Sequence, residues 1–408
     1  MKQLRVGVIG TGMRSASYLR NLAPELRPAV QVVALADPDE ANRARFAAFF
    51  AEAFFAGGRR PRQYERGADL IEGEDLDALI IGSPNHAHAH DALLAMPRRI
   101  PILLEKPVAI SLEECRRLWQ GYLEAGEPPV AVGFVLRYAP FYTRVEELIR
   151  EAELGQLLAI DADESIGAGL TAFFYGSGSW RRWDRLTGGF MVEKCCHDFD
   201  ILNWLAGARA ERVFSLARRS HLTPRAREQR HRRFESEALR KAALDYGDTE
   251  LKRAFRAVAG DSLYEADTDV PDHQAVMIEY DNGILSTFTA CLAQPRDARR
   301  LRVYGANGAL EGDIGRGKIV VDKPRGEGDG SDSREFAVAT DEGGHHGADP
   351  LINEAFWNRA LGLPGTIRAG IREGIEAVLV GLAAEESKKS GLPVDVARMR
   401  RGVFGADA

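Results

Sequence analysis

The sequence predicts two domains, the first of which is an α/β domain built on a parallel sheet that helices cover on both faces. Three observations support this prediction. The chain has 408 residues, which is more than one hydrophobic core usually fills. Short apolar runs alternate with helical stretches over the first 133 residues, and strands separated by helices form parallel sheets. The first of these runs ends in Gly10-Thr11-Gly12, directly before a helical stretch.

The strands of this domain are expected at five apolar runs. They are LRVGVIG (4–10), VQVVALAD (30–37), DALIIGS (77–83), PILLEKP (101–107) and PPVAVGF (128–134). Each run is short, rich in aliphatic residues and bounded by turn-forming or polar residues, which is typical of buried strands. Between the first two runs, a helix is expected from about Ser15 to Leu26.

The turn after the first strand has the composition of a dinucleotide-binding site. Gly10 and Gly12 leave the backbone around Thr11, Met13 and Arg14 bare at the start of a helix, where a pyrophosphate binds well. Ser15 stands where the strict pattern has a third glycine. Asp37 ends the second strand, 25 residues after Gly12, where a carboxylate accepts hydrogen bonds from ribose hydroxyls and repels a 2'-phosphate. The pattern favours NAD over NADP, and a tight turn with an exposed acid in another α/β fold is the alternative.

Composition argues against several classes of partner. The net charge of −6 disfavours nucleic acid and anionic membranes, because both are bound through excess Lys and Arg. No apolar run approaches the roughly 20 residues of a membrane helix, and the N-terminal MKQLRVGVIG is too strand-like for a signal peptide. We therefore expect a cytoplasmic protein. Its four cysteines, Cys115, Cys195, Cys196 and Cys291, form no CxxC pair and are expected to be reduced thiols.

Residues 188–198, GGFMVEKCCHD, carry the densest cluster of reactive side chains. Gly188 and Gly189 interrupt the chain, and the following residues predict a helix that stops at Gly207. On one helix, Glu193 and His197 are four residues apart and share a face, so that the carboxylate orients the imidazole and raises its basicity. Such a pair suits hydride transfer, in which a base takes the hydroxyl proton and an ammonium stabilises the alkoxide.

Two other interpretations of this segment are weaker. Candidate metal ligands are Glu193, Cys196, His197 and Asp200. Zinc sites normally draw ligands from two separated segments and no second cluster with that spacing follows, so no metal is expected. A catalytic thiol is disfavoured because free cysteines are usually small core residues. Lys194 is either a solvated helix residue or a second charge in the pocket.

Several motifs together resemble the Gfo/Idh/MocA oxidoreductases, the glucose-fructose oxidoreductase and inositol dehydrogenase type. They are VGVIGTG, ALADPD, SPNHAHAHDALLAM, LLEKPVA, VGFVLRYAP, WRRWDRLTGGFMVEKCCHDFDILNWLAG, DNGILSTF and VYGANGALEG. The resemblance implies a Rossmann domain with a doubly wound parallel sheet over residues 1–133. It implies an α+β domain with a large, open, mainly antiparallel sheet over residues 134–408. It further implies a homo-oligomer, a dimer or tetramer formed through that sheet, and a substrate site between the domains.

The same resemblance implies roles for individual residues. Lys106 of the EKP triplet contacts the substrate hydroxyl and the cofactor ribose, and Glu193 and His197 are the acid and histidine of the second motif. Further cofactor contacts are implied for Ser83, Pro84, Asn85, His88 and Glu105. Substrate contacts are implied for Arg137, Tyr138, Trp180, Arg181, Trp183, Asp198 and His345, although core packing explains the tryptophans about equally well. His86, His88 and His90 alternate, but their surroundings favour a cofactor-side loop over a metal site.

The chain departs from the family's usual pattern. Glu193 stands where Asp is usual, and Lys194, Cys195 and Cys196 stand where small or apolar residues are usual, which predicts a subgroup with its own substrate. Residues 218–256 contain 12 Lys or Arg and 6 Asp or Glu, which predicts a basic helical insertion with a solvated face or a subunit contact. A closing helix is expected from about Thr366 to Ser390, packed toward the Rossmann domain.

The predicted function is NAD-dependent hydride transfer to or from a sugar, sugar acid or polyol. Two alternatives remain from other classes. One is a redox-neutral glycoside hydrolase or lyase that uses tightly bound NAD, and the other is an NAD-binding regulator without catalysis.

Overall fold

The structure is a computed structural model that describes residues 2–54, 60–151, 153–176, 179–229, 263–265, 267–326, 330–340 and 344–405. The chain forms two compact units, each assembled from segments that are not contiguous in the sequence. Unit 1 comprises residues 1–143, 341–379 and 399–408, and unit 2 comprises residues 144–340 and 380–398.

Unit 1 is built on a six-stranded sheet in the order β3-β2-β1-β4-β5-β6. All its strand pairs are parallel, which confirms the predicted parallel sheet. The strands are β1 (Leu4–Ile9), β2 (Val30–Ala36), β3 (Arg62–Tyr64), β4 (Ala78–Ile81), β5 (Ile102–Leu104) and β6 (Val130–Val132). The strand order changes direction at β1 and β4, and the carboxyl ends of such a pair are where doubly wound sheets bind ligands. Strand β3 was not expected, because its residues are mostly exposed and form no apolar run.

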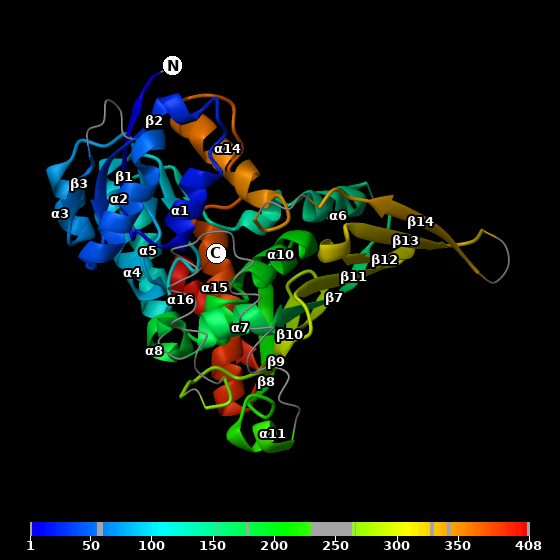
Figure 1. The fold of residues 1–408 in the computed structure, drawn as a ribbon. Coiled ribbons are helices and arrows are strands. Elements are labelled where there is room, and N and C mark those ends of the chain that lie inside the picture. Colours follow the sequence, from blue (N-terminus) through cyan, green and yellow to red (C-terminus); the bar gives the residue numbers. More distant parts are fainter. Residues whose placement is uncertain are drawn as a thin grey trace. The chain divides into compact units, whose positions relative to one another are not determined.

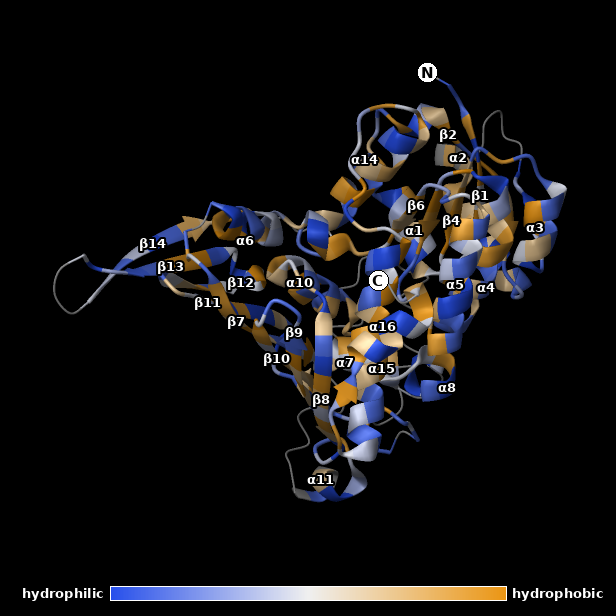
Figure 2. Ribbon diagram, turned by 180° about the vertical axis from the view of Figure 1, so that it is seen from behind, coloured by the Kyte–Doolittle hydropathy of each residue, from blue (hydrophilic) through white to orange (hydrophobic). Residues whose placement is uncertain are grey.

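The early helices of unit 1 lie along this sheet (Figure 1). They are α1 (Met13–Arg20), α2 (Glu40–Phe54), α3 (Gly67–Gly73), α4 (Asn85–Ala95) and α5 (Leu112–Glu124). The start of helix α5 is capped by side chains: the Ser111 hydroxyl accepts a hydrogen bond from the Glu114 amide, and the Glu114 carboxylate accepts one from the Ile110 amide. Cys115 and Leu118 are buried on one side of α5, and Figure 2 shows hydrophilic and hydrophobic residues along the same helix. Helix α1 begins two residues before the expected start and ends at Arg20.

Three late helices contribute to unit 1. They are α14 (Ala348–Ala360), the first part of α15 (Ile371–Ser390) and the last part of α16 (Val396–Phe404). Helix α14 lies beside α1 (Figure 1). Helix α15 starts in unit 1 and ends in unit 2. The expected start near Thr366 was wrong, because the Thr366 carbonyl and the Arg368 amide bond to the Tyr138 hydroxyl instead of forming a helical turn.

Unit 2 is built on a nine-stranded sheet in the order β14-β13-β12-β11-β7-β10-β9-β8-β15. The strands are β7 (Leu157–Gly167), β8 (Ala210–Arg218), β9 (His273–Tyr280), β10 (Leu285–Gln294), β11 (Ala298–Gly305), β12 (Gly308–Asp313), β13 (Lys318–Pro324), β14 (Ser331–Ala337) and β15 (Val394–Asp395). Among the described strand pairs of this sheet, only β7–β10 is parallel, so the predicted mainly antiparallel sheet is confirmed. In β10, Ser286, Phe288 and Ala290 are buried on one face, and the residues between them are exposed on the other.

The helices between residues 140 and 229 are short; α7 contacts β7 and β10 of this sheet, and α10 contacts β7. They are α6 (Pro140–Arg150), α7 (Ala168–Tyr175), α8 (Asp184–Thr187), α9 (Phe190–Glu193), α10 (Cys196–Ala206) and α11 (Pro224–Gln229). Phe199 of α10 packs edge-on against Phe288 of β10, with ring centroids 5.4 Å apart. The expected continuous helix after Gly189 was wrong, because Lys194 and Cys195 form a turn between α9 and α10. Gly207 does end α10 in a left-handed conformation, as expected.

The predicted insertion at 218–256 is described only as far as residue 229. Helix α11 falls inside it, and residues 230–262 lie outside the described residues. Within the described part of the chain, no helix is both long and hydrophobic enough to cross a membrane.

Candidate functional site

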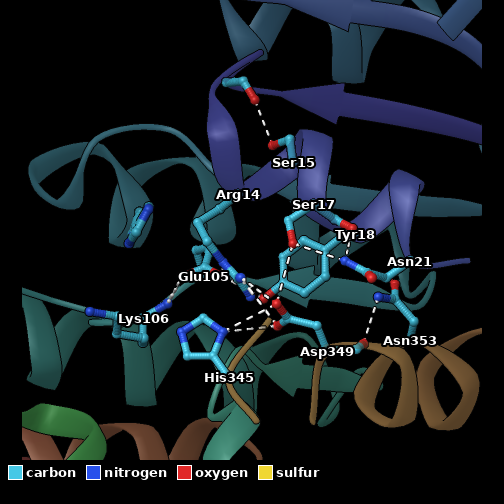
Figure 3. A network of polar contacts seen from close by, with 12 residues as sticks. Arg14, Ser15, Ser17, Tyr18, Asn21, Glu105, Lys106, His345, Asp349 and Asn353 are labelled. Carbon is cyan, nitrogen blue, oxygen red and sulfur yellow. Dashed lines mark hydrogen bonds and ion pairs between the residues drawn. The ribbon is translucent and has the colours of Figure 1, made fainter. Parts of the chain in front are cut away.

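The turn after β1 is shaped for a ligand that binds backbone amides. Gly10 has φ +81°, and an added Cβ would lie 2.4 Å from the Ser83 amide nitrogen, so only glycine fits there. Gly12 precedes α1, and an added Cβ there would meet no atom within 4 Å. The Ser15 hydroxyl donates to the Gly10 carbonyl at 2.6 Å (Figure 3). Serine is therefore accepted at the position of the third glycine because its hydroxyl bonds to the turn.

Asp37 follows β2 and faces this turn. One of its carboxylate oxygens accepts the Thr11 amide at 2.9 Å and the Thr11 hydroxyl at 3.0 Å. The other oxygen accepts the Asp39 amide at 3.0 Å. The predicted acid and the glycine turn thus lie together at the carboxyl ends of β1 and β2, which is the arrangement that a dinucleotide ribose requires.

Ser83 and Pro84 lie in the loop after β4 and Asn85 begins α4; His88, expected in this loop, instead lies on α4 and holds the loop in place. The His88 ring is buried, with Nδ1 2.7 Å from the Pro107 carbonyl and Nε2 2.6 Å from the Ser83 carbonyl. Burial lowers the pKa of His88, although both carbonyl contacts oppose that shift. The imidazole therefore joins the loop after β4 to the residues directly after Lys106.

Glu105 and Lys106 directly follow β5, and Glu105 is the centre of a buried network (Figure 3). Its carboxylate accepts the Arg14 Nε at 2.8 Å, the Tyr18 hydroxyl and the Lys106 backbone amide at 3.1 Å. Burial by itself would raise the pKa of Glu105, but Arg14 and Tyr18 outweigh it and the pKa is lowered. An ionised carboxylate therefore holds the backbone of Lys106.

The other side of Arg14 contacts α14. Its Nη1 lies 3.2 Å from the Asp349 carboxylate, which also contacts His345 Nδ1 at 3.2 Å. Burial favours the neutral acid, but Arg14 and His345 hold the pKa of Asp349 well below its usual range. His345, His346 and Gly347 all have φ between 53° and 84°, a left-handed run that side chains rarely adopt. The predicted substrate residue His345 is thus placed in the cofactor-binding unit.

Arg137 and Tyr138, also predicted to contact substrate, are buried in unit 1. Arg137 Nη1 donates to the Arg368 carbonyl at 2.8 Å, and the Arg368 amide donates to the Tyr138 hydroxyl at 2.9 Å. These two side chains therefore hold the segment that leads into α15.

In unit 2, the Gly188-Gly189 step shapes the start of α9. The Glu385 carboxylate of α15 accepts the Met191 amide at 2.9 Å. An added Cβ on Gly189 would lie 2.4 Å from the Glu385 Cδ. The second glycine therefore leaves room for the carboxylate that fixes the first turn of the motif.

Glu193 is buried at the end of α9 and lies beside two partners. The Tyr175 hydroxyl donates to one of its oxygens at 2.8 Å, and Arg181 Nε donates to the other at 3.2 Å. The Arg181 guanidinium also lies over the Trp180 ring at 4.4 Å. Two predicted substrate residues, Trp180 and Arg181, thus join Glu193 in one cluster, while Trp183 packs beside the Arg182 guanidinium at 4.9 Å. His197 is buried near the start of α10.

Lys194 and Asp198 bind a different pair of residues. Lys194 Nζ lies 2.8 Å from the Glu164 carboxylate of β7, and Arg299 Nε of β11 donates to Asp198 at 2.9 Å. Arg299 also pairs with Glu164. Burial raises the pKa of Asp198 to about 6, with Glu164 adding to the effect and Arg299 opposing it. Lys194 is therefore not a solvated helix residue, because its side chain is 12% exposed and forms an ion pair with the buried Glu164 carboxylate.

The same region contains the one potential metal cluster among the described residues. Glu164, Cys195 and Asp198 place ligand atoms within 4.8 Å of one another. Lys194 and Arg299 already neutralise both carboxylates there. Burial and the two acids also raise the pKa of Cys195 well above its usual value, which disfavours the thiolate that binds metals. The residues therefore fit an ion-pair cluster better than a metal site.

Several site residues were not found from the sequence. They are Tyr18 and Asp349 in unit 1, and Glu164, Tyr175, Arg299 and Glu385 in unit 2. None of them belongs to a local motif. A strand-pairing prediction is the one signal that would have found a pair, because Arg299 and Glu164 face each other across β11 and β7.

The parallel sheet and the glycine turn together define the class of protein. A parallel sheet that carries a glycine turn and an acid at the ends of neighbouring strands is a dinucleotide-binding domain. The chain belongs to the Gfo/Idh/MocA oxidoreductase family. Residues 4–134 match its model described as "Oxidoreductase family, NAD-binding Rossmann fold". Residues 146–396 match its model described as "Oxidoreductase family, C-terminal alpha/beta domain". The predicted family, fold class and NAD cofactor are thereby confirmed.

Similar proteins include a putative oxidoreductase YteT of Bacillus subtilis, 24% identical over 356 residues, which are 78% of this chain and 80% of the relative. Inositol 2-dehydrogenase of Corynebacterium glutamicum is 28% identical over 215 residues, or 52% of this chain and 57% of the relative. The chain therefore spans little more than half the length of that dehydrogenase. Levoglucosan dehydrogenase in complex with NADH has a similar fold, with a TM-score of 0.73, 19% identity and coverage of 97% of this chain and 99% of that one.

Proposed function

We propose that this protein is an NAD-dependent dehydrogenase or reductase that acts on a hydroxyl or ketone of a sugar, sugar acid or polyol. One observation carries the proposal: the glycine turn, Asp37 and Lys106 follow the carboxyl ends of β1, β2 and β5, three strands of one parallel sheet. The similarity to inositol and levoglucosan dehydrogenases supports the substrate class.

The chain supplies two groups for the proton chemistry. When bound, NAD accepts or donates the hydride. Lys106 carries an ammonium that stabilises negative charge developing on the substrate oxygen. His197 takes the hydroxyl proton during oxidation and returns it during reduction. Glu193 is held by Tyr175 and Arg181 in the motif that contains His197.

The experiment has two parts. Cofactor released from the purified protein is identified by mass spectrometry, and a panel of sugars, sugar acids and polyols is then followed at the absorbance of reduced nicotinamide. We expect NAD and a substrate-dependent absorbance change. A protein that retains NAD and cleaves glycosides without any absorbance change would show redox-neutral chemistry. NAD binding without turnover of any kind would show a regulator.

We also propose that the exposed face of the unit 2 sheet joins copies of this chain. Leu216 of β8, Met277 of β9 and Leu285 of β10 are 53%, 59% and 56% exposed on neighbouring strands. Exposed apolar groups clustered in this way are typical of an interface. A Met277→Lys variant is expected to shift the mass measured by light scattering toward the monomer, whereas Leu363→Lys, at an exposed position in unit 1, is the control.

The four free cysteines are consistent with a reducing compartment such as the cytoplasm.

A further inference from the structure

A partly buried arginine in unit 1, Arg14, connects three segments that are far apart in the sequence. Arg14 lies in the first turn of α1, and its Nε donates to Glu105 while its Nη1 donates to Asp349. The Arg14 side chain is 24% exposed, and both carboxylates are buried. Figure 3 shows the guanidinium between the two acids. Arg14 thus bridges the nucleotide turn, the end of β5 and the start of α14.

This bridge continues directly to Lys106. One oxygen of Glu105 accepts Arg14 Nε and the Tyr18 hydroxyl, and the other oxygen accepts the Lys106 backbone amide at 3.1 Å. An added Cβ at Gly133 would lie 2.6 Å from the Tyr18 hydroxyl and 3.0 Å from the carboxylate, so the space around Glu105 is filled. The orientation of this carboxylate is therefore set by Arg14 and Tyr18, and it sets the position of the Lys106 amide.

Charge explains why the arginine is needed. Glu105 and Asp349 are two buried acids that approach the same guanidinium. Without it, burial would favour their protonated forms, and a protonated or displaced Glu105 holds the Lys106 amide less firmly. Asp349 in turn is bonded to Arg14 and His345, and it keeps the guanidinium directed toward Glu105.

We propose that Arg14 is a positioning residue for Lys106, and that Asp349 of α14 orients Arg14 for this role. Arg14 acts on the reaction only through Glu105 and the Lys106 backbone. A direct role in holding the cofactor phosphates is the competing explanation, and it predicts a different pattern of effects. The kinetic part of the test rests on the proposed dehydrogenase function, whereas the chemical-labelling part does not.

The kinetic test uses Arg14→Met and Arg14→Lys. A small misplacement of a reacting group lowers turnover by about a hundredfold, so we expect kcat of Arg14→Met to fall by about 10- to 100-fold. The Kd for NAD should change much less than kcat. Arg14→Lys retains a charge but not the two-sided guanidinium, so its kcat should lie between those of the wild type and Arg14→Met. Arg20→Met removes an arginine from the other end of α1, where it lies over Phe49, and serves as the matched control.

The decisive kinetic comparison uses a Lys106→Met background. If Arg14 acts through Lys106, adding Arg14→Met to this background lowers the residual kcat little further. An equal loss in both backgrounds would overturn the proposal, as would a large rise in the NAD Kd with unchanged kcat. Asp349→Asn should also lower kcat. The double variant Arg14→Met/Asp349→Asn should have a kcat close to that of Arg14→Met alone. Asp349→Asn also provides a second readout if Arg14→Met does not fold.

A labelling experiment tests the positioning without any substrate. The cofactor-free protein is treated briefly with an amine-acetylating reagent, and the extent of modification of Lys106 is measured by peptide mass spectrometry. Lys2, with a side chain that is 68% exposed, is the internal reference. We expect the Lys106-to-Lys2 labelling ratio to change in Arg14→Met and Asp349→Asn and to stay the same in Arg20→Met. An unchanged ratio in both network variants would overturn the positioning role. A wild-type protein that turns over no sugar would contradict the proposed function and leave this readout intact.

Discussion

Glu385 occupies the space that a side chain on Gly189 would need. The Glu385 carboxylate bonds to the Met191 amide, and an added Cβ on Gly189 would lie 2.4 Å from its Cδ. Gly189 also has φ +103°, so both space and backbone conformation require glycine.

Gly189→Ala is therefore expected to lower the free energy of unfolding by more than the strain of a positive φ alone. The control is Gly207→Ala, where φ is +59° and no atom lies within 4 Å of the added Cβ; strain alone should lower its stability by about 1 to 2 kcal/mol. Both variants are compared by urea unfolding. Replacing Glu385 by Ala in the Gly189→Ala protein should recover part of the difference, and a Gly189→Ala protein no less stable than Gly207→Ala would contradict the steric argument.

Asp37 should make NAD bind more tightly than NADP, because its carboxylate would face a 2'-phosphate. Asp37→Ala is expected to lose much of this discrimination, measured as the ratio of the two dissociation constants. Thr11→Val removes one hydrogen bond to Asp37 but keeps the carboxylate, so the control should keep the preference for NAD. Tighter binding of NADP by the wild type would show that the carboxylate does not set the specificity.

Neither Cys195 nor Cys196 is expected to be catalytic. Both are buried, and the pKa of Cys195 is raised well above its usual value, which disfavours the nucleophilic thiolate. Cys195→Ala and Cys196→Ala should retain turnover within about tenfold while losing about 1 to 3 kcal/mol of stability to poorer packing. Cys115→Ala, also buried but in unit 1, is the control. Loss of all turnover in a folded, NAD-binding variant would restore the nucleophile hypothesis, and activity that resists chelators would count against a metal.

Asp198 should make stability depend on pH in a defined window. Its pKa is raised to about 6 in the folded protein, compared with about 3.9 in an unfolded chain. Between these values the folded state binds the proton more tightly, so stability falls as the pH rises, by up to about 1.4 kcal/mol per pH unit. Asp198→Asn does not titrate. The difference in unfolding free energy between wild type and variant should therefore change between about pH 4 and 6 and be constant above; parallel curves would contradict the shift. The charged neighbours in this cluster are Glu164, Lys194 and Arg299.

Lys106 and His197 are expected to serve the same chemical step. Removing either should lower kcat by about a hundredfold or more, the usual scale of general acid–base assistance. His197→Ala should change NAD affinity far less, because His197 belongs to unit 2 and the glycine turn to unit 1. The two losses should not add on a logarithmic scale, since groups that act on one transition state fail together. Glu193→Gln should shift the dependence of kcat on pH, and Glu193→Asp should have a smaller effect on kcat. Unchanged turnover in His197→Ala would remove that residue from the mechanism.

Local patterns in the sequence predicted the cofactor-binding half well. The apolar run of β1, the Gly10–Gly12 turn and the acid at Asp37 are set by residues close together in the chain, and the structure brings them together. Their spacing is sufficient because each strand and the turn after it obey short-range rules of burial and backbone conformation.

Such local patterns could not predict pairs of residues that are far apart in the sequence. Arg14 and Asp349 are separated by 335 positions, and Arg299 and Glu164 by 135. Helical periodicity likewise favoured one helix through Lys194 and Cys195, whereas side-chain bonds from Lys194 and Asp198 to the sheet accompany a turn there. At Lys194 and Cys195, tertiary contacts outweighed the local preference for a helix.

Helix α14 belongs to unit 1 although it follows residues 144–340 of unit 2 in the sequence, and this limits how the domains of this enzyme can be exchanged with those of other proteins. A fragment that ends at Thr143 would keep all six strands of the parallel sheet but lose Asp349, one of the two acids that bind Arg14. The cofactor-binding unit is therefore not a module that can be exchanged at a single junction. A chimaera that joins this sheet to a foreign second domain must also carry the segment from His345 to the end of α14, or replace Arg14 with an uncharged residue.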